Sequence, residues 1–389
     1  MAVPLLEKAM RRGLAVVKIH SHPGGLAEFS PVDDASDGEL FESLRSWTGD
    51  LPFGSMVMLP DGKLFGRVSS ANGFRQLSRI AVTGDRIRFF GLGSTDVREQ
   101  ELRTSQAFGP GTVSLLRQLK IGIVGCSGTG SWVCELLGRH GVGGLVLVDP
   151  DFVELKNLNR ILNATYQDAL DGTLKVNVQK RAIEAMGFGT LVSTFAKDLM
   201  DRSVVEALAD CDIVFGCMDS HDGRDLLNRI AVFYNIPYFD VGVSLHADGL
   251  GGVSHVVGRV NYLQPDGSSL LSRKHISAEL VDAQSCLRRN PHEYEARRGE
   301  GYVANAHVES PAVAGVNCQL ASLAVNDCLA RLHGFRSDDG HDEICMCIVN
   351  TYMQTIRHEE PCLRLAKRAG RGDCAPLLDV PQLGERCVA

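Results

Sequence analysis

Short runs of consecutive apolar residues alternate with segments of helical spacing from residue 120 onward. The runs Lys120–Val124 and Gly144–Val148 have the continuous hydrophobicity typical of parallel strands covered on both faces, and Ser131–Arg139 between them has the spacing of a helix. Ile213–Cys217 and Ile236–Val241 repeat the buried-strand pattern. This alternation predicts an α/β fold with a Rossmann-like, doubly wound and mostly parallel sheet.

The residues before 93 show a different pattern, in which turn residues separate short apolar runs. Apolar residues at helical spacing predict a helix over Asp37–Trp47, and a further helix is expected over Leu5–Arg12. The turn Pro60-Asp61-Gly62 predicts a β-hairpin, because glycine tolerates positive φ. The strands expected here are Leu14–His20, Gly54–Pro60, Lys63–Val68 and Arg79–Phe90. The pattern therefore predicts a smaller α+β domain.

We expect four segments along the chain. They are the first domain (1–92), a polar connector with an entry helix (93–118), the α/β domain (119–335) and a C-terminal extension (336–389). The extension contains a strand-like run at Ile344–Val349. The most apolar window, Pro311–Ala330, carries asparagine, glutamine and aspartate side chains, so it predicts a buried helix rather than a membrane span.

Composition and charge narrow the classes of protein. The chain has 389 residues, 44% of them hydrophobic and 22% charged, without a low-complexity tract, which excludes fibrous and disordered proteins. Its 40 basic and 47 acidic residues give a net charge of −7, so no nucleic-acid partner is expected. The N-terminus lacks the apolar core of a secretory signal. We therefore expect the 12 cysteines to be reduced thiols in a cytoplasmic protein with no membrane partner.

A glycine-rich loop, Gly125 to Gly130, joins a predicted strand to a predicted helix. Glycines at such a place let backbone N–H groups approach phosphate oxygens at the positive end of the helix. The next strand ends in Asp149, which lies 24 residues after Gly125, close to the spacing at which an acid binds ribose hydroxyls. These features fit NAD and ATP equally well.

The polar residues that follow favour ATP. Arg160 and Lys175 come after the ribose acid, and Asp219 follows another buried strand. A dehydrogenase has no obvious need for these charges. Cleavage of the bond between the α- and β-phosphates does need them, because cations neutralise the developing charge and an aspartate holds Mg²⁺.

This ordered set resembles the ubiquitin-activating superfamily of the ThiF/MoeB/HesA type over residues 100–330. The resemblance implies ATP-dependent adenylation of the C-terminal glycine of a ubiquitin-like or sulfur-carrier protein, with release of pyrophosphate. It implies that Asp149 binds ribose, that Asn157, Arg160 and Lys175 contact phosphates, and that Asp219 ligates Mg²⁺. The nucleotide-binding set that it implies is Gly125, Ser127, Gly128, Gly130, Asp149, Asp151, Asn157, Arg160 and Lys175.

The resemblance also extends to the connector and to a cysteine. The segment Leu102–Gly109 is similar to the "RQ…FG" helix whose arginine reaches the ATP of the partner protomer, which implies a homodimer and a role for Arg103, although Thr104 replaces the usual glutamine. Cys286 is the best candidate for a nucleophile that takes over the acyl group, because Arg288 and Arg289 would favour its thiolate; an incidental thiol is the alternative. A downstream conjugating enzyme or a sulfur donor would be a further partner.

Some members of the superfamily hold structural zinc with two Cys-x-x-Cys pairs. This chain has no such pair, so structural zinc is not expected in the α/β domain. Most of the other cysteines fall in apolar surroundings and are expected to be small core residues.

The first domain contains His20-Ser21-His22-Pro23, followed by Ser30 and Asp33. Histidines at i and i+2 project from the same side of a strand, and Asp33 would supply a third ligand for Zn²⁺. Ser30 would donate to an oxyanion. The set resembles the "HxHP…SxxD" motif of the JAMM/MPN metalloproteases, which remove ubiquitin-like tails, and thus implies a zinc-dependent trimming activity.

One part of that motif is missing. The general-base glutamate of the family precedes the histidines by a strand and more, whereas only 19 residues precede His20 here, and Glu7 falls in a predicted helix. We therefore expect weak peptidase activity at most, because general catalysis contributes about 10²- to 10⁴-fold. Two alternatives stay open for the whole chain: an NAD-dependent oxidoreductase, and a non-catalytic binding scaffold.

Overall fold

The computed structural model describes residues 3–11, 14–48, 53–70, 73–91, 96–248, 250–299, 313–336, 340–347, 352–367 and 369–370. The chain divides into two compact units. The first unit comprises Met1–Val82 and Arg88–Ser94, and the second comprises Thr83–Ile87 and Thr95–Ala389.

The first unit is built on a four-stranded sheet in the order β1-β2-β3-β4. Strand β1 pairs parallel with β2, and the other pairs are antiparallel. Phe41 and Leu44 of helix α2 pack with Phe53 of β2 to form the core. The elements are α1 (Val3–Arg11), β1 (Val16–Ser21), α2 (Pro31–Thr48), β2 (Phe53–Met58), β3 (Leu64–Ser70), β4 (Gly73–Gln76), β5 (Ile80–Val82) and β6 (Arg88–Phe90).

Most elements of the first unit match the expected pattern, with two corrections. The hairpin at Pro60-Asp61-Gly62 is confirmed, since β2 and β3 are antiparallel and Gly62 has φ 78°. The expected single strand Arg79–Phe90 is wrong, because β5 and β6 pair antiparallel around an intervening turn. Strand β4 was not expected, since its four residues are all exposed and carry no buried pattern.

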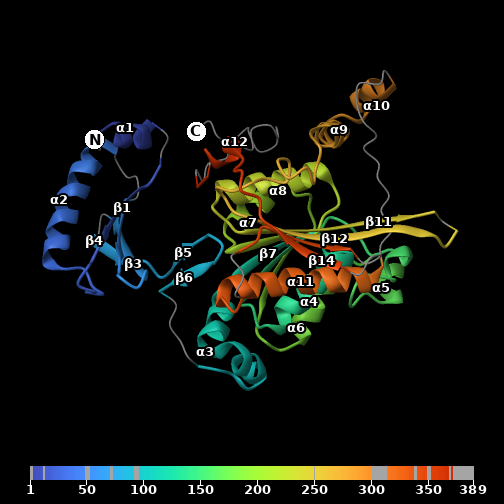
Figure 1. The fold of residues 1–389 in the computed structure, drawn as a ribbon, viewed down its shortest axis with the longest axis horizontal. Coiled ribbons are helices and arrows are strands. Elements are labelled where there is room, and N and C mark those ends of the chain that lie inside the picture. Colours follow the sequence, from blue (N-terminus) through green and yellow to red (C-terminus); the bar gives the residue numbers. More distant parts are fainter. Residues whose placement is uncertain are drawn as a thin grey trace. The chain divides into compact units, whose positions relative to one another are not determined.

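The second unit contains an eight-stranded sheet in the order β14-β13-β12-β11-β10-β7-β8-β9 (Figure 1). The five strands from β11 to β9 run parallel, and β12, β13 and β14 add antiparallel to one side. The doubly wound, mostly parallel sheet is thereby confirmed. The strands are β7 (Lys120–Val124), β8 (Gly144–Val148), β9 (Leu191–Phe195), β10 (Ile213–Gly216), β11 (Tyr238–Ala247), β12 (Val253–Leu263), β13 (Glu343–Cys347) and β14 (Tyr352–Ile356).

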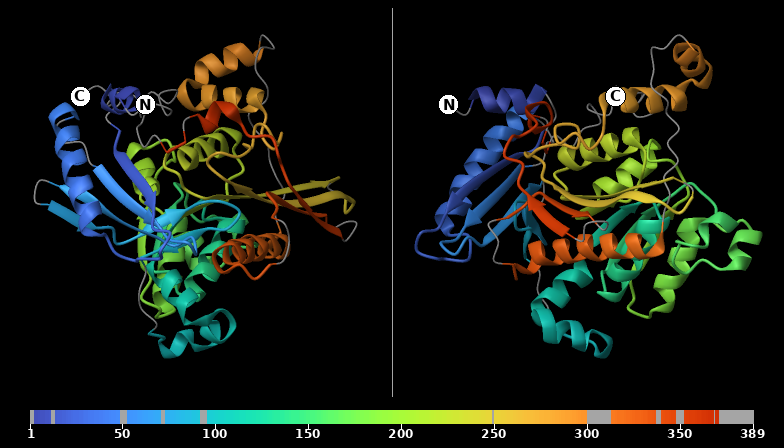
Figure 2. Two further views of the ribbon diagram at one scale, coloured as in Figure 1. Left: turned by 60° about the vertical axis from the view of Figure 1, so that its left-hand side comes forward. Right: turned by 45° about the vertical axis from the view of Figure 1, so that its right-hand side comes forward.

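Helices cover both faces of this sheet. In Figure 1, α7 and α8 lie on one face and α4, α6 and α11 on the other. Figure 2 shows α9 and α10 together beyond α8, away from the sheet. The elements are η1 (Glu99–Glu101), α3 (Leu102–Gln118), α4 (Gly128–Arg139), η2 (Leu155–Asn157), α5 (Tyr166–Leu170), α6 (Lys175–Ala185), α7 (Arg202–Ala209), α8 (His221–Phe233), α9 (Ala278–Arg289), α10 (Pro291–Gly299), α11 (Ala314–His333) and α12 (Leu363–Ala366).

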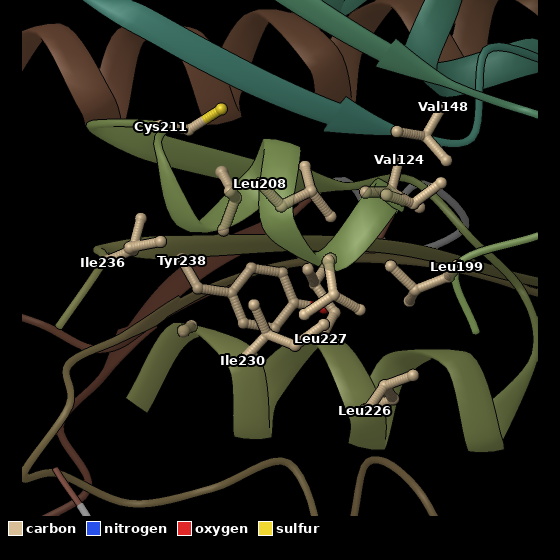
Figure 3. Close-up of a cluster of buried hydrophobic side chains, with 14 of the residues drawn as sticks. Val124, Val148, Leu199, Leu208, Cys211, Leu226, Leu227, Ile230, Ile236 and Tyr238 are labelled. Carbon is tan, nitrogen blue, oxygen red and sulfur yellow. The ribbon is translucent and has the colours of Figure 1, made fainter. Parts of the chain in front are cut away.

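The apolar runs of the strands form the core that the sequence predicts. Figure 3 shows Leu208 of α7 and Leu227 of α8 packed with Val124 and Val148, which are the last residues of β7 and β8. All four side chains are at most 3% exposed. The cluster holds α7 and α8 against the sheet. It thereby also holds the carboxyl ends of β7, β8 and β10 in place.

The loop Thr83–Ile87 belongs to the second unit, although the strands on either side of it belong to the first. Ile87 is fully buried, and its N–H donates to the carbonyl of Arg331 on α11 at 3.0 Å. Arg331 in turn donates to the carbonyl of Asp85 at 3.1 Å, and the Tyr262 hydroxyl donates to the carbonyl of Gly84 at 2.7 Å. This loop is therefore an integral part of the core beside α11.

The apolar window near the C-terminus is the helix α11, as expected, and it ends at Gly334 in the left-handed conformation. Pro311, where the expected helix begins, lies outside the described residues. Within the described part of the chain, no helix is long and apolar enough to cross a membrane. The ten cysteines found there are all free thiols, and Cys345 and Cys347 pack in the core beside Val257.

Candidate functional site

A cavity of about 1180 Å³ opens at the carboxyl ends of β7, β8, β10 and β11. This is the place where the strand order reverses in a doubly wound sheet, and where such sheets bind ligands. Of the residues that the sequence predicts for nucleotide and Mg²⁺ binding, the lining contains Gly125, Ser127, Gly128, Asp149, Asp151, Asn157, Arg160, Lys175 and Asp219.

The glycine loop packs so closely that side chains would not fit. Gly125 has φ 90°, and a Cβ there would lie 2.6 Å from the carbonyl oxygen of Cys217. A Cβ on Gly130 would lie 1.7 Å from the carbonyl oxygen of Gly125. Gly130 does not line the cavity. Its role in the structure is in packing, because the absence of a side chain lets helix α4 begin directly against the loop.

Asp149 lies at the end of β8 and is only 5% exposed. Its carboxylate accepts hydrogen bonds from the N–H of Cys126 at 2.7 Å and of Asp151 at 3.0 Å, which ties it to the glycine loop. Burial raises the pKa of Asp149, while the nearby Lys175 and the two N–H groups oppose that rise. The Lys175 ammonium lies 3.9 Å from Asp149 and 2.7 Å from Asp151.

Asn157 and Arg160 lie on the segment that follows β8. The side-chain oxygen of Asn157 accepts from the N–H of Glu154 at 3.1 Å and so caps the short helix η2, and Asn157 is buried. The Arg160 guanidinium donates to the carbonyl of Lys156 at 3.0 Å and to the side chain of Asn159 at 3.2 Å. Arg160 has no acidic partner within the described residues, so its charge is available to an anion in the cavity.

Asp219 lies three residues after the end of β10 and is exposed to the cavity. No hydrogen bond or ion pair is found for its carboxylate in the described part of the chain. Asp240 nearby is different, because it is fully buried and pairs with Arg224 and with the Tyr238 hydroxyl. Among the described residues, Asp219 is therefore an oxygen donor without a partner, of the kind that Mg²⁺ prefers.

Asn317 of α11 also lines the cavity and was not predicted as a site residue. It is 3% exposed, and its side-chain oxygen accepts from the Thr129 hydroxyl at 3.3 Å. Its Nδ2 is buried, lies 2.4 Å from where a Cβ on Gly128 would be, and has no partner among the described residues. Leaving a buried amide N–H without an acceptor costs about 1–3 kcal/mol of stability. A ligand group in the cavity would supply the acceptor that this amide lacks. The only signal in the sequence was a polar residue in an apolar window.

Cys286 and Arg103 do not line the cavity. Cys286 of α9 is 3% exposed and packs with Ala283 and Tyr294. The interpretation that Arg288 and Arg289 favour its thiolate is wrong in this structure: Arg288 pairs with Asp222, and Arg289 donates to a backbone carbonyl.

Arg297 is the arginine that reaches this thiol, with its Nη1 3.7 Å from the Cys286 sulfur. Arg103 lies exposed on α3, where it donates to the Gln106 side chain at 2.9 Å. The nucleophile role of Cys286 and the reach of Arg103 into a partner protomer stay predictions.

In the first unit, His20, His22 and Asp33 converge as the motif predicts. The Nε2 atoms of the histidines lie 2.9 Å and 3.2 Å from the Asp33 oxygens and 3.1 Å from each other. His22 Nδ1 lies 2.8 Å from the carbonyl of Leu26, the kind of contact that orients a metal-bound imidazole. The three side chains thus fit the donor set and spacing of a Zn²⁺ site.

Ser30 supports this cluster in a different way from the one expected. Its N–H and its hydroxyl both donate to Asp33 at 2.7 Å, and its hydroxyl also accepts from the Asp33 N–H, so the two residues cap α2. Burial raises the pKa of Asp33, but these hydrogen bonds and the two imidazoles together outweigh burial and lower the pKa to about 2. The hydroxyl is therefore already engaged, and the expectation that Ser30 donates to an oxyanion is not met in this arrangement.

Two curated relatives match parts of this chain. The adenylyltransferase and sulfurtransferase UBA4 of Meyerozyma guilliermondii is 34% identical over 144 residues, which are 36% of this chain and 33% of that protein. Ubiquitin-like modifier-activating enzyme 5 of Bombyx mori is 30% identical over 163 residues, which are 40% of this chain and 39% of that protein. The chain therefore matches well under half the length of either relative.

A solved structure and a family model extend the comparison. The structure of the microcin C7 biosynthetic enzyme MccB in complex with N-formylated MccA has a TM-score of 0.54 at 19% identity, covering 69% of this chain and 75% of that one, and so shares the fold. The model of the ThiF family matches residues 100–362, more than half of the chain. This chain belongs to the ThiF family.

Proposed function

We propose that the second unit adenylates the C-terminal glycine of a ubiquitin-like or sulfur-carrier protein, with ATP as the second substrate. The observation that carries this proposal is the cavity itself. It combines the glycine loop, the buried Asp149, the cations Arg160 and Lys175, and Asp219, which has no ion-pair partner in the described part of the chain, at the carboxyl ends of neighbouring strands. Members of the ThiF family that are adenylyltransferases bind ATP with Mg²⁺ in general.

The proposed reaction needs charge neutralisation more than proton transfer. A carboxylate oxygen of the terminal glycine attacks the α-phosphorus of ATP, the bond from that phosphorus to the bridging oxygen breaks, and pyrophosphate leaves. Arg160 and Lys175 neutralise the negative charge that develops on the phosphates, and Asp149 holds the ribose. Asp219 is the oxygen ligand for Mg²⁺, which when bound would share in neutralising the triphosphate.

The unpaired groups of the cavity support this assignment. The Asn317 amide lacks an acceptor and Asp219 lacks a cation among the described residues, so both fit a ligand that brings phosphate oxygens and a divalent ion. The curated relatives, by their names, are an adenylyltransferase and a modifier-activating enzyme. Because the match covers a minority of each relative, the carrier protein as substrate is our proposal.

ATP–pyrophosphate exchange tests the proposed function. We expect exchange of labelled pyrophosphate into ATP only when a carrier protein ending in Gly-Gly is present, and none with the same carrier lacking these two glycines. Calorimetry with ATP and with NAD provides an independent reading. Tight NAD binding without ATP binding would overturn the proposal in favour of the oxidoreductase alternative, and absence of exchange with every Gly-Gly carrier would favour the scaffold.

The first unit is proposed to bind Zn²⁺ through His20, His22 and Asp33. When bound, Zn²⁺ in such a site would polarise a peptide carbonyl or a water molecule. No general base accompanies the three ligands in the described residues, and Glu7 lies exposed on α1. We therefore propose at most weak trimming or deconjugation of ubiquitin-like tails.

Metal analysis tests this site directly. We expect His22→Asn to lower the zinc content of the full chain by one ion, because one of three protein ligands is lost. The exposed His292→Asn on α10 is the matched control and should retain its zinc. Unchanged zinc content in His22→Asn would remove the site, and vigorous isopeptidase activity that His22→Asn abolishes would show that a base is present after all.

The proposed enzyme works as a homodimer in which Arg103 reaches the ATP of the partner protomer. This proposal is supported by the exposed position of Arg103 on α3, where the one hydrogen-bond partner found for it among the described residues is the Gln106 side chain. Cys286 is proposed to accept the acyl group before a conjugating enzyme or sulfur donor acts, which requires its burial beside Tyr294 to be relieved.

A further inference from the structure

Three potential metal ligands converge in the second unit beside the cavity, and none of them belongs to the predicted nucleotide-binding or zinc-binding residues. His275 lies between β12 and α9, Glu343 is the first residue of β13, and His358 follows the last residue of β14 by two positions. The antiparallel register pairs Glu343 with Ile356, which explains why His358 arrives beside the glutamate. Three separate segments of the chain thus bring their side chains to one point.

Both imidazoles direct the same ring nitrogen at the same carboxylate oxygen. The Nε2 of His275 lies 2.9 Å from Glu343 Oε2, and the Nε2 of His358 lies 2.8 Å from that same atom. Ligands of one tetrahedral Zn²⁺ ion at about 2.0–2.1 Å lie roughly 3.3 Å from one another, so small shifts would admit an ion between them. His20, His22 and Asp33 are likewise two histidines and one carboxylate, although there each imidazole faces a different carboxylate oxygen.

The other contacts of the cluster leave this oxygen available. Arg259 pairs with Oε1 of Glu343, so Oε2 is the atom left for a metal. Glu343 is 1% exposed, whereas the two imidazoles are partly exposed, which gives a buried anion with an open side. The His358 N–H donates to Asp342 at 2.7 Å and fixes the backbone of that ligand.

We propose that His275, Glu343 and His358 bind one Zn²⁺ ion, with a fourth position left for water. Two imidazole nitrogens and one carboxylate oxygen form a donor set that zinc accepts in proteins. The ion joins β13 and the end of β14 to the segment before α9. His275 also lines the nucleotide cavity, and its carbonyl accepts from Arg224 at 3.3 Å, so the ion stabilises one wall of the cavity.

Zinc content and affinity test this proposal independently of adenylation. We expect the full chain to bind two Zn²⁺ ions, and the double variant His20→Asn/His22→Asn to bind one. In that double variant, His358→Asn should lower the Zn²⁺ affinity of the remaining site by about 100-fold or more, since even the loss of a residue that only supports a ligand lowers metal affinity 10- to 100-fold. His292→Asn in the same background is the matched control and should retain the ion.

The readouts are elemental analysis after chelator treatment and reloading, competition with a chromophoric chelator, and the visible spectrum of the Co²⁺-loaded chain. If His358→Asn fails to fold, His275→Asn serves as the second variant. The double variant His20→Asn/His22→Asn is by itself a direct test of the site. One bound ion with a tetrahedral Co²⁺ spectrum in this variant supports the site. No bound ion in a folded background, or an affinity unchanged by His358→Asn, would overturn it.

Discussion

Replacing Asp219 by asparagine should lower ATP–pyrophosphate exchange by about 10²- to 10³-fold, with little change in the thermal stability of the protein. Asp219 is exposed to the cavity and has no hydrogen bond or ion pair within the described residues, so its loss breaks no contact that holds the fold. The amide keeps the size of the side chain but removes the negative charge that a divalent ion requires. The measurement is the exchange rate as a function of Mg²⁺ concentration.

The control for this variant is Asp171→Asn. Asp171 is an exposed aspartate that follows α5, accepts from the Gln167 side chain at 2.7 Å and does not line the cavity. We expect it to leave exchange unchanged. If the exchange rate of Asp219→Asn is within twofold of that of the unmodified chain, Asp219 does not hold the Mg²⁺ ion. The proposed adenylation would then still stand, with the ion bound by other residues.

Gly130→Ala should destabilise the second unit by about 3 kcal/mol and abolish ATP binding. A Cβ at this position would lie 1.7 Å from the carbonyl oxygen of Gly125, and that oxygen belongs to the backbone of the glycine loop. Helix α4 and the loop must therefore separate, which displaces the N–H groups that are expected to face the phosphates. Denaturant unfolding and ATP calorimetry measure the two effects.

Gly111→Ala on α3 is the matched substitution. A Cβ at Gly111 would meet no atom within 4 Å, so we expect equal or slightly higher stability, because alanine lowers the entropy of the unfolded chain. If Gly130→Ala unfolds like Gly111→Ala and still binds ATP, the close approach of α4 to the loop is not required.

The sequence predicts the second unit well because its strands are buried on both faces. Continuous apolar runs give β7 and β8 with their observed bounds, and the glycine loop between strand and helix locates the cavity. The antiparallel pairing of β12, β13 and β14 was not predicted. Strand β14 is almost entirely exposed and carries no apolar run, and the run Ile344–Val349, which marks β13, does not indicate the strands with which it pairs. In the first unit, the run Arg79–Phe90 contains a turn that the apolar pattern did not indicate.

The candidate sites divide in the same way. Residues within three positions of the end of a buried strand, such as Asp149 and Asp219, could be placed from the sequence, because parallel strands end at a common edge. Asn317, Glu343 and His358 could not, because they reach their neighbours through long-range packing of α11 and pairing of β13 with β14. The surroundings of Cys286 were mistaken for a similar reason: its neighbour in space is Arg297 of the next helix.

The loop Thr83–Ile87 determines where the chain can be cut. A shortened protein that begins after residue 92 keeps every strand of the large sheet but loses Ile87, which fills a fully buried place, and Gly84, whose carbonyl accepts from Tyr262. The Arg331 carbonyl and guanidinium would each lose a hydrogen bond in such a fragment. Separate production of the second unit therefore requires that this loop be kept, for instance by joining it through a linker to the residues that follow. Simple deletion of the first 92 residues should yield an insoluble or short-lived product.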